Sequence, residues 1–154
     1  MNTVRETLAT IAKTLGLADL SLNANGQAEI IFGQGFSAYV TRIEETVMEL
    51  SFRLPSLDNP NRAVLRSMLN ANSLGGGTGG GRLALDIETD EVIYCERWNV
   101  EDMSEARAEA RIQEFSEYGA FWLTEGTKLV IDKAYDTDED RLDASSIGEH
   151  MIRV

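Results

Sequence analysis

The sequence predicts an α+β fold, a two-layer sandwich in which three helices pack on a twisted, mainly antiparallel sheet. Three observations lead to this prediction. Apolar residues repeat at helical spacing in three segments, they form strand-like runs in the segments between, and the links between consecutive strands are short. The predicted order is helix, three strands, helix, two strands, helix, and the short links favour antiparallel pairing.

The first helix is predicted over residues 4–15. Val4, Leu8, Ile11 and Leu15 follow one another at spacings of four, three and four residues, which places them on one face of a helix. Gly16 then provides a stop signal, because glycine readily adopts the left-handed conformation that ends many helices. We expect this face to pack on a sheet, and a partner could use any part that stays uncovered.

Three strands are predicted next, at residues 28–32, 36–43 and 46–54. The pair Asn25-Gly26 is a turn signal before the first strand, and two glycines around residue 34 separate it from the second. The third strand alternates apolar and polar residues, so one of its faces is expected to be buried.

A second helix is predicted after Pro55, which ends the third strand. Asp58 or Asn59 can cap this helix, and Pro60 suits its first turn. The helix is expected to end near Leu74, where a run of six glycines interrupted by one threonine begins. We interpret this run as a helix stop followed by a tight crossing of another backbone, because glycine has no side chain to obstruct such an approach.

Two strands, at residues 82–87 and 92–98, and a third helix complete the predicted fold. The helix should begin near Asp102, with Glu105 as the partner of a capping box, and Gly126 is expected to end it. Residues 1–126 are thus predicted to form one domain. Residues 127–154 are predicted to be an acidic C-terminal extension, solvated or mobile, in which 128–134 could add a short strand or helix.

The charge of the chain argues against several classes of partner. Its formal net charge is -12 and its sequence pI is about 4.4, so nucleic acid and anionic membrane surfaces should repel it. One cysteine, Cys95, rules out an internal disulfide and suits a reducing compartment. Charged residues at positions 5, 6 and 13 interrupt any leader-like apolar run. We therefore expect a cytoplasmic protein.

Known catalytic and metal-binding motifs fit the sequence poorly. The glycine run follows a helix, whereas a phosphate cradle must lead into a helix N-terminus. Asp136, Asp138 and Asp140 resemble the start of a calcium loop, but Arg141 and Ile147 stand where that loop needs Gly and Glu. His150 is the sole histidine and has no neighbouring nucleophile. We therefore predict no catalytic residue, no metal site and no cofactor.

A stretch around the glycine run resembles a known signature. Residues 69–80 read Leu-Asn-Ala-Asn-Ser-Leu-Gly-Gly-Gly-Thr-Gly-Gly and are followed by the apolar strand segment 83–86. In this order, the stretch is similar to class I type III secretion chaperones, the Tir-chaperone (CesT-like) family. The flanking helices and strands agree with this family pattern over about residues 3–123.

The resemblance implies a homodimer that acts without catalysis, ATP use or cofactors. Its partner would be the N-terminal segment of one or more effector proteins, held in extended form, soluble and competent for secretion; the secretion ATPase is a further candidate partner. Two residue sets follow by resemblance. The effector-binding set is Leu8, Ile11, Leu15, Ile30, Phe32 and Phe36. The dimer-interface set is Leu65, Met68, Leu69, Leu85 and Trp98.

Two alternatives from other classes stay open at this point. A small acidic hydrolase or isomerase would need a deep pocket with convergent polar groups. An adaptor would bind a folded partner rather than an unfolded segment. For every residue in the two predicted sets, ordinary core packing is the competing interpretation.

Overall fold

The computed structural model describes residues 2–33, 35–73 and 77–136, and it confirms the predicted α+β fold. A helical segment η3 with π-type hydrogen bonding follows α3, and the helix then continues to Asp136. The elements are α1 (Val4–Leu15), β1 (Gln27–Ile31), β2 (Ser37–Glu44), β3 (Val47–Arg53), η1 (Pro55–Leu57), α2 (Arg62–Asn72), β4 (Arg82–Asp86), β5 (Glu91–Asn99), α3 (Glu105–Phe121) and η3 (Trp122–Gly126).

The five strands form one antiparallel sheet in the order β1-β2-β3-β5-β4. Consecutive strands β1, β2 and β3 are joined by short turns, which is why they lie side by side in chain order. Strand β5 then pairs with β3, and β4 lies outside it. The two edges of the sheet are therefore β1 and β4.

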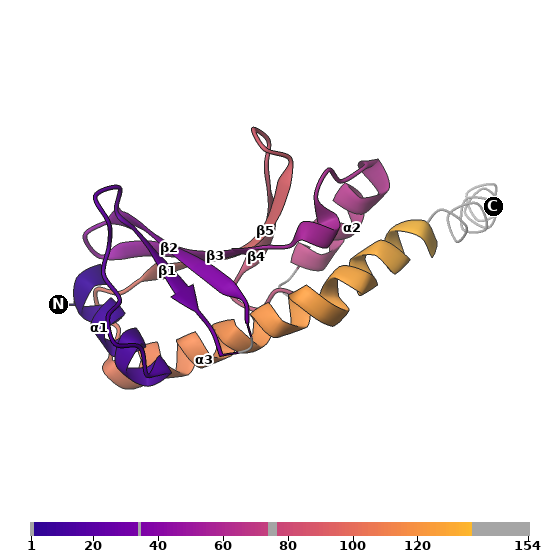
Figure 1. The fold of residues 1–154 in the computed structure, drawn as a ribbon. Helices are drawn as coiled ribbons and strands as arrows, with labels where there is room; N and C mark the ends of the chain where they lie inside the picture. Colours follow the sequence, from indigo (N-terminus) through magenta and orange to yellow (C-terminus); the bar gives the residue numbers. More distant parts are fainter. Residues whose placement is uncertain (1, 34, 74–76, 137–154) are drawn as a thin grey trace, which may run out of the picture.

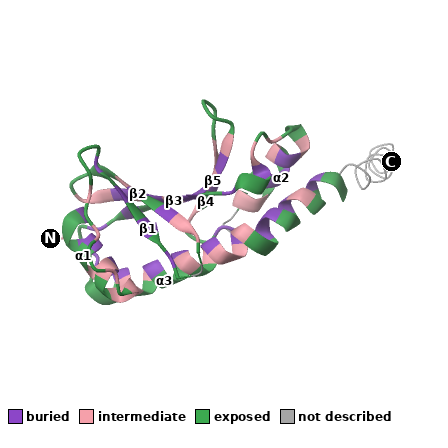
Figure 2. Ribbon diagram, viewed as in Figure 1, coloured by how far each residue is buried: buried purple, intermediate pink, exposed green. Residues whose placement is uncertain are grey.

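The helices α1 and α3 cover one face of the sheet, and α2 lies beyond the sheet, beside the helical continuation that follows α3 (Figure 1). Buried residues gather between the sheet and these helices (Figure 2). Aromatic rings fill the centre of this layer. The ring of Phe52 stacks on Tyr94 at 5.1 Å between centroids and meets Phe115 edge-on at 5.4 Å.

Helix α1 begins and ends where its sequence predicts. Thr3 and Glu6 form a reciprocal capping box at its start. Gly16 ends it in the left-handed conformation, with φ of 68°. The helix is therefore fixed locally at both ends.

The starts of the other two helices differ from the prediction. Asn61, not Asp58 or Asn59, caps α2, because its side chain accepts the Val64 N–H at 3.0 Å. The turn η1 and its C-terminal cap, Asp58, occupy residues just before this position, so the helix begins later than predicted. Ser104 caps α3 in place of Asp102, and Glu105 becomes its first residue rather than a capping-box partner. In both cases a polar residue a few positions along the chain has the better geometry for a cap.

The predicted stop at Gly126 is wrong, because the helix continues through it. The Thr127 N–H bonds to the Trp122 carbonyl, five residues back, which is π-type geometry. Gly126 is needed here for packing, since a Cβ atom would lie 2.4 Å from the Trp122 ring. The division between a domain and an extension at this point stays a prediction, and residues 137–154 lie outside the described residues.

The glycine run allows close packing against the core. At Gly81 a Cβ atom would lie 2.5 Å from the Tyr94 ring and 2.8 Å from the Cys95 carbonyl oxygen. The predicted tight crossing of another backbone is thus confirmed at this position. Gly79, with φ of 56°, lies against the ring of Tyr118. Residues 74–76, which include the expected helix end at Leu74, lie outside the described residues.

Candidate interaction surfaces

The described residues offer few groups for chemistry. They contain no group of three or more His, Cys, Asp or Glu residues that could hold a metal ion. Cys95 is buried, and burial raises the pKa of its thiol to about 11. Within the same residues, no helix is long and apolar enough to cross a membrane. Asp138, Asp140 and His150 lie outside the described part of the chain.

The predicted effector-binding residues lie mainly in the core. Leu8, Ile11, Ile30 and Phe32 are buried, which corrects the expectation that they form an open surface. For Leu8 and Ile11 the cause is that α1 has a single apolar stripe, which faces the interior of the protein. Leu15 and Phe36 are half-buried and pack against the margin of the core. A role in partner binding stays a prediction for these residues.

One of the buried residues, Leu8, nevertheless lines a surface hollow of about 550 Å³. The hollow lies between α1, the segment leading to β1 and the β2–β3 turn. Leu20 and Leu22, both half-buried, supply further apolar lining, and Arg5 and Arg42 are among its polar residues. Sequence patterns did not identify Leu20 or Leu22, because they lie in an irregular segment without periodicity.

The free edge of β1 is open over part of its length. Backbone bonds join Arg42 to Gly26 and Phe32 to Phe36, and bonded and non-bonded pairs alternate in an antiparallel ladder. The backbone groups of residues 27, 29 and 31 therefore point away from β2. Those of Gln27 are satisfied by Asn23, at 2.7 and 3.0 Å.

Glu29 and Ile31 form the open part of this edge. In the described part of the chain, no hydrogen-bond partner is found for the outward backbone groups of either residue. The Ile31 side chain is 63% exposed, and Tyr39, the register partner of Glu29, is also exposed. Unpaired strand edges of this kind can accept a further strand. An apolar side chain and open backbone groups thus coincide at Ile31.

The predicted dimer residues divide between surface and core. Leu69 is 70% exposed, and Leu65 and Leu85 are half-buried. Met68 and Trp98 are buried within the protomer, which corrects their expected place on a surface. Both lie on the inward faces of their elements.

Ile87, which was not predicted, adds to the exposed apolar side chains near α2 and β4. It is 82% exposed and follows directly after β4. Together Leu65, Leu69, Leu85 and Ile87 are called the α2–β4 surface below. Large exposed apolar side chains that form a contiguous patch commonly mark a surface that binds a partner.

The β4 edge is closed at one position by a side chain of α2. The Asn72 amide donates to the Leu83 carbonyl at 2.9 Å and accepts from the Leu83 N–H at 2.8 Å. It thereby occupies the two backbone groups that another strand would use. Asn72 lies in the signature stretch, so the sequence pointed to the residue without indicating its role.

A buried charged network links β5 to α3. The Glu96 carboxylate accepts hydrogen bonds from Tyr94 and Trp98, each at 2.9 Å, and Arg111 lies 3.5 Å away. The Arg111 guanidinium also sits 4.5 Å from the centroid of the Trp98 ring. Burial, then the neighbouring carboxylate, raises the pKa of Tyr94. Both Glu96 oxygens have partners, so the network holds the structure together rather than presenting a reactive group.

Sequence comparison gives one family. The model of the Tir chaperone protein (CesT) family matches residues 6–122. A comparison with curated proteins gives no match. The family match ends at Trp122, where the π-type segment begins.

Three solved structures are similar in fold. One is the Yersinia pestis type III secretion chaperone SycH in complex with a stable fragment of YscM2, with TM-score 0.58 and 19% identity over 77% of this chain and 98% of that chain. Another is the ExsC–ExsE complex, with TM-score 0.63 and 20% identity over 78% and 90%. A third is the HopA1–SchA chaperone–effector complex, with TM-score 0.58 and 19% identity over 76% and 90%.

Proposed function

The chain belongs to the Tir chaperone protein (CesT) family, and from this premise we propose how it works as a type III secretion chaperone. It binds the N-terminal segment of one or more effector proteins in extended form and keeps them soluble and competent for secretion. It acts as a homodimer and without catalysis. The observation that carries the proposal is the family match over residues 6–122, together with the open β1 edge.

The β1 edge suits an unfolded client because backbone pairing makes few demands on sequence. An extended segment can hydrogen-bond to Glu29 and Ile31 and so extend the sheet by one strand. The exposed Ile31 side chain offers an apolar contact beside these bonds. The solved complexes of SycH and of SchA each contain a bound fragment or effector, which supports binding of such a segment here.

The hollow beside α1 offers a second contact for the client. Leu8, Leu20 and Leu22 give it an apolar part, and Asn23 belongs both to its lining and to the closed end of the β1 edge. A client strand that pairs with Glu29 and Ile31 therefore lies near this hollow. In this proposal Leu8 contributes from the lining, while Ile11, Ile30 and Phe32 support the surface from the core.

The α2–β4 surface is the proposed dimer interface. Its exposed members Leu69 and Ile87 would be shielded by the same surface of a second copy, as two-fold pairing requires. Met68 and Trp98 support this surface from the core. The high negative charge would keep client-free dimers apart. The proposed location is the bacterial cytoplasm, where the secretion ATPase is a further proposed partner.

Retention of secreted proteins is the direct test. The tagged chain, purified from cells that carry a type III secretion system, should retain an effector, whose N-terminal segment is then made alone. That unfolded segment should bind as tightly as the full effector, and hydrogen exchange at the Glu29 and Ile31 amides should slow on binding. Binding of the folded effector without its N-terminal segment would instead indicate an adaptor.

A matched pair of variants locates the client site. Ile31→Asp places a charge at the open edge and should weaken segment binding at least tenfold. Ile43 is also an exposed isoleucine but lies on β2, and Ile43→Asp should leave binding unchanged. Both variants should remain dimers. Equal binding by the two variants would show that the client does not use the β1 edge.

A further inference from the structure

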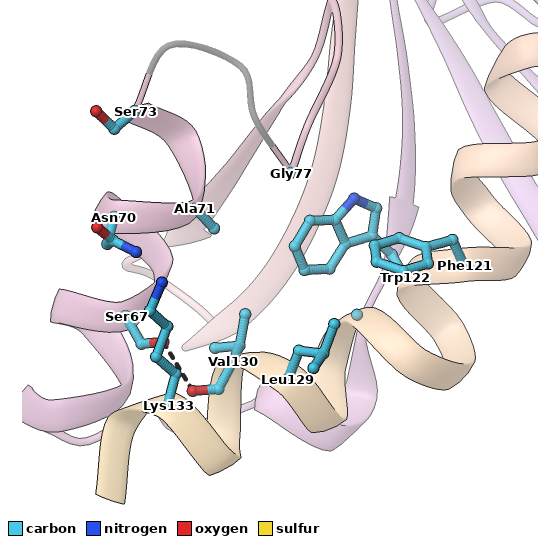
Figure 3. Close-up of a pocket in the computed structure, with 11 residues that line it drawn as sticks. Ser67, Asn70, Ala71, Ser73, Gly77, Phe121, Trp122, Leu129, Val130 and Lys133 are labelled. Atoms are coloured by element: carbon cyan, nitrogen blue, oxygen red, sulfur yellow. Dashed lines mark hydrogen bonds between the residues drawn. The ribbon is translucent and has the colours of Figure 1, made fainter. Parts of the chain in front are cut away.

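A groove of about 260 Å³ lies between α2 and the helix that follows the π-type segment (Figure 3). Its apolar lining comes from Ala71 on α2 and from Phe121, Trp122, Leu129 and Val130 on the other side. We propose that residues 137–154 of the same chain bind in this groove through their apolar side chains. The proposal concerns a surface that the client and dimer surfaces do not include.

The groove exists because the helix beyond Gly126 is held against α2. The Ser67 hydroxyl donates to the Val130 carbonyl at 2.7 Å, and the Asn61 amide donates to the Tyr135 hydroxyl at 3.2 Å. Val130 and Ala134 are buried in this contact. Leu129, by contrast, lines the groove and is 58% exposed. One wall of the groove therefore presents a large apolar side chain to solvent.

The size and chemistry of the groove fit aliphatic side chains of a peptide. Its volume is below the roughly 300–1,000 Å³ of typical small-molecule sites. Its deeper lining is apolar, and Ser67, Asn70 and Ser73 supply polar groups along α2. A peptide can place one or two aliphatic side chains inside and leave its backbone near these polar groups.

The proposed dimer does not cover this groove. On a helix each residue advances by about 100°, so Leu69 lies about 160° from Ser67, on the other side of α2. The α2–β4 surface and the groove are thus separate faces of one helix. A second copy bound at Leu69 leaves the groove free for another occupant.

Residues 137–154 are close to the groove in the chain. They follow Asp136, and Leu129 lies seven residues, or about 10 Å of helix, before that point. Eighteen residues can span up to about 60 Å when extended, so the segment reaches the groove with length to spare. A short tether also gives a local concentration on the order of millimolar, far above that of a free competitor.

The composition of the segment divides it into a linker and a ligand. Acidic residues dominate its first part, whereas Ile147, Met151, Ile152 and Val154 give the later part an apolar character. Leu129 and Val130 in the groove wall lie, like this segment, beyond the family match, which ends at residue 122. The similar solved structures cover only 76% to 78% of this chain. Part of one groove wall and the proposed occupant therefore both lie outside the part of the chain that matches the family.

Methionine methyl NMR on the full chain tests the proposal. With ¹³C-methyl methionine, Met151 should show nuclear Overhauser contacts to the Trp122 ring and Leu129, and an upfield shift from that ring. Ala71→Leu fills the groove and should return the Met151 methyl to its random-coil shift. Ala63→Leu, on the same helix but outside the groove lining, should leave the contacts intact.

A second variant keeps the test valid if Ala71→Leu fails to fold. Ile152→Asp changes only the segment and should also release the Met151 methyl. A wild-type Met151 methyl at its random-coil shift, without contacts to Trp122 or Leu129, overturns the proposal. Contacts seen only between differently labelled copies also overturn it, because the occupant would then be the segment of a second copy.

Discussion

Removing the Asn72 side chain tests how the β4 edge is closed. In Asn72→Ala the two hydrogen bonds to Leu83 disappear, and the Leu83 N–H and carbonyl lose their only partners among the described residues. Leu83 is buried, so water replaces these partners poorly. The contact also joins α2 to β4, and its loss should loosen the helix at its C-terminal end.

The expected loss follows from the two bonds. A protein hydrogen bond contributes about 1 kcal/mol net, so the pair contributes about 2 kcal/mol. Alanine recovers about 0.5 kcal/mol of this through its higher helix propensity. The free energy of unfolding should therefore fall by about 1.5 kcal/mol, the difference between the lost hydrogen bonds and the gain in helix propensity. Asn72→Asp keeps an acceptor for the Leu83 N–H but places a negatively charged oxygen beside the Leu83 carbonyl. It should therefore destabilise the protein at least as much as Asn72→Ala.

Urea unfolding at a fixed protomer concentration measures this loss. Asn70→Ala is the matched control, because Asn70 lies in the same helix, is exposed and makes no such pair of bonds to β4. Both substitutions replace Asn by Ala in the last turn of α2, so their difference reports mainly on the Leu83 contact. If Asn72→Ala and Asn70→Ala were equally stable, the edge closure would contribute nothing and our reasoning would be refuted.

Three further predictions concern other parts of the molecule. Leu69→Asp should shift the protein from dimer toward monomer in sedimentation velocity, and an unchanged dimer would remove Leu69 from the interface. Gly81→Ala should lower the free energy of unfolding by about 1–3 kcal/mol, because its Cβ atom meets the Tyr94 ring, whereas Gly80→Ala, in open space, should have little effect. Cys95 should resist thiol reagents at pH 8 until the protein unfolds. Because burial raises the pKa of its thiol from an ordinary value of 9.0 to about 11, the free energy of unfolding should fall as the pH rises between these two values.

The sequence predicted the elements of this fold because they carry local signals. The stripe of α1, the turn signals of the strands and the alternation in β3 each specify an element within a few residues. Predictions of helix ends were less accurate. Gly126 is a stop signal by itself, but packing against Trp122 overrides it. Ser104 replaces Asp102 as a cap because several polar residues compete within one turn.

The candidate surfaces were harder to predict. An apolar stripe shows that a face is buried, but it does not show whether the same chain or a partner buries it. Ile11 and Trp98 were predicted as contact residues by the family resemblance, and both lie in the core of the protomer. Asn23, Leu20 and Leu22 lie in an irregular segment, and their positions depend on contacts distant in sequence. Ile31 was recognisable as part of a strand, but its edge position follows only from the strand order.

The π-type turn at residues 122–126 changes the direction in which the long helix presents its side chains. One additional residue within a turn offsets all later positions by about 100°. The first half of the helix can therefore face the sheet while Val130 and Ala134 face α2. Deletion of a single residue in this turn would restore ordinary α-helical phase and aim these two side chains elsewhere. A one-residue change could thus detach the last helical turns from α2 while leaving the sandwich intact.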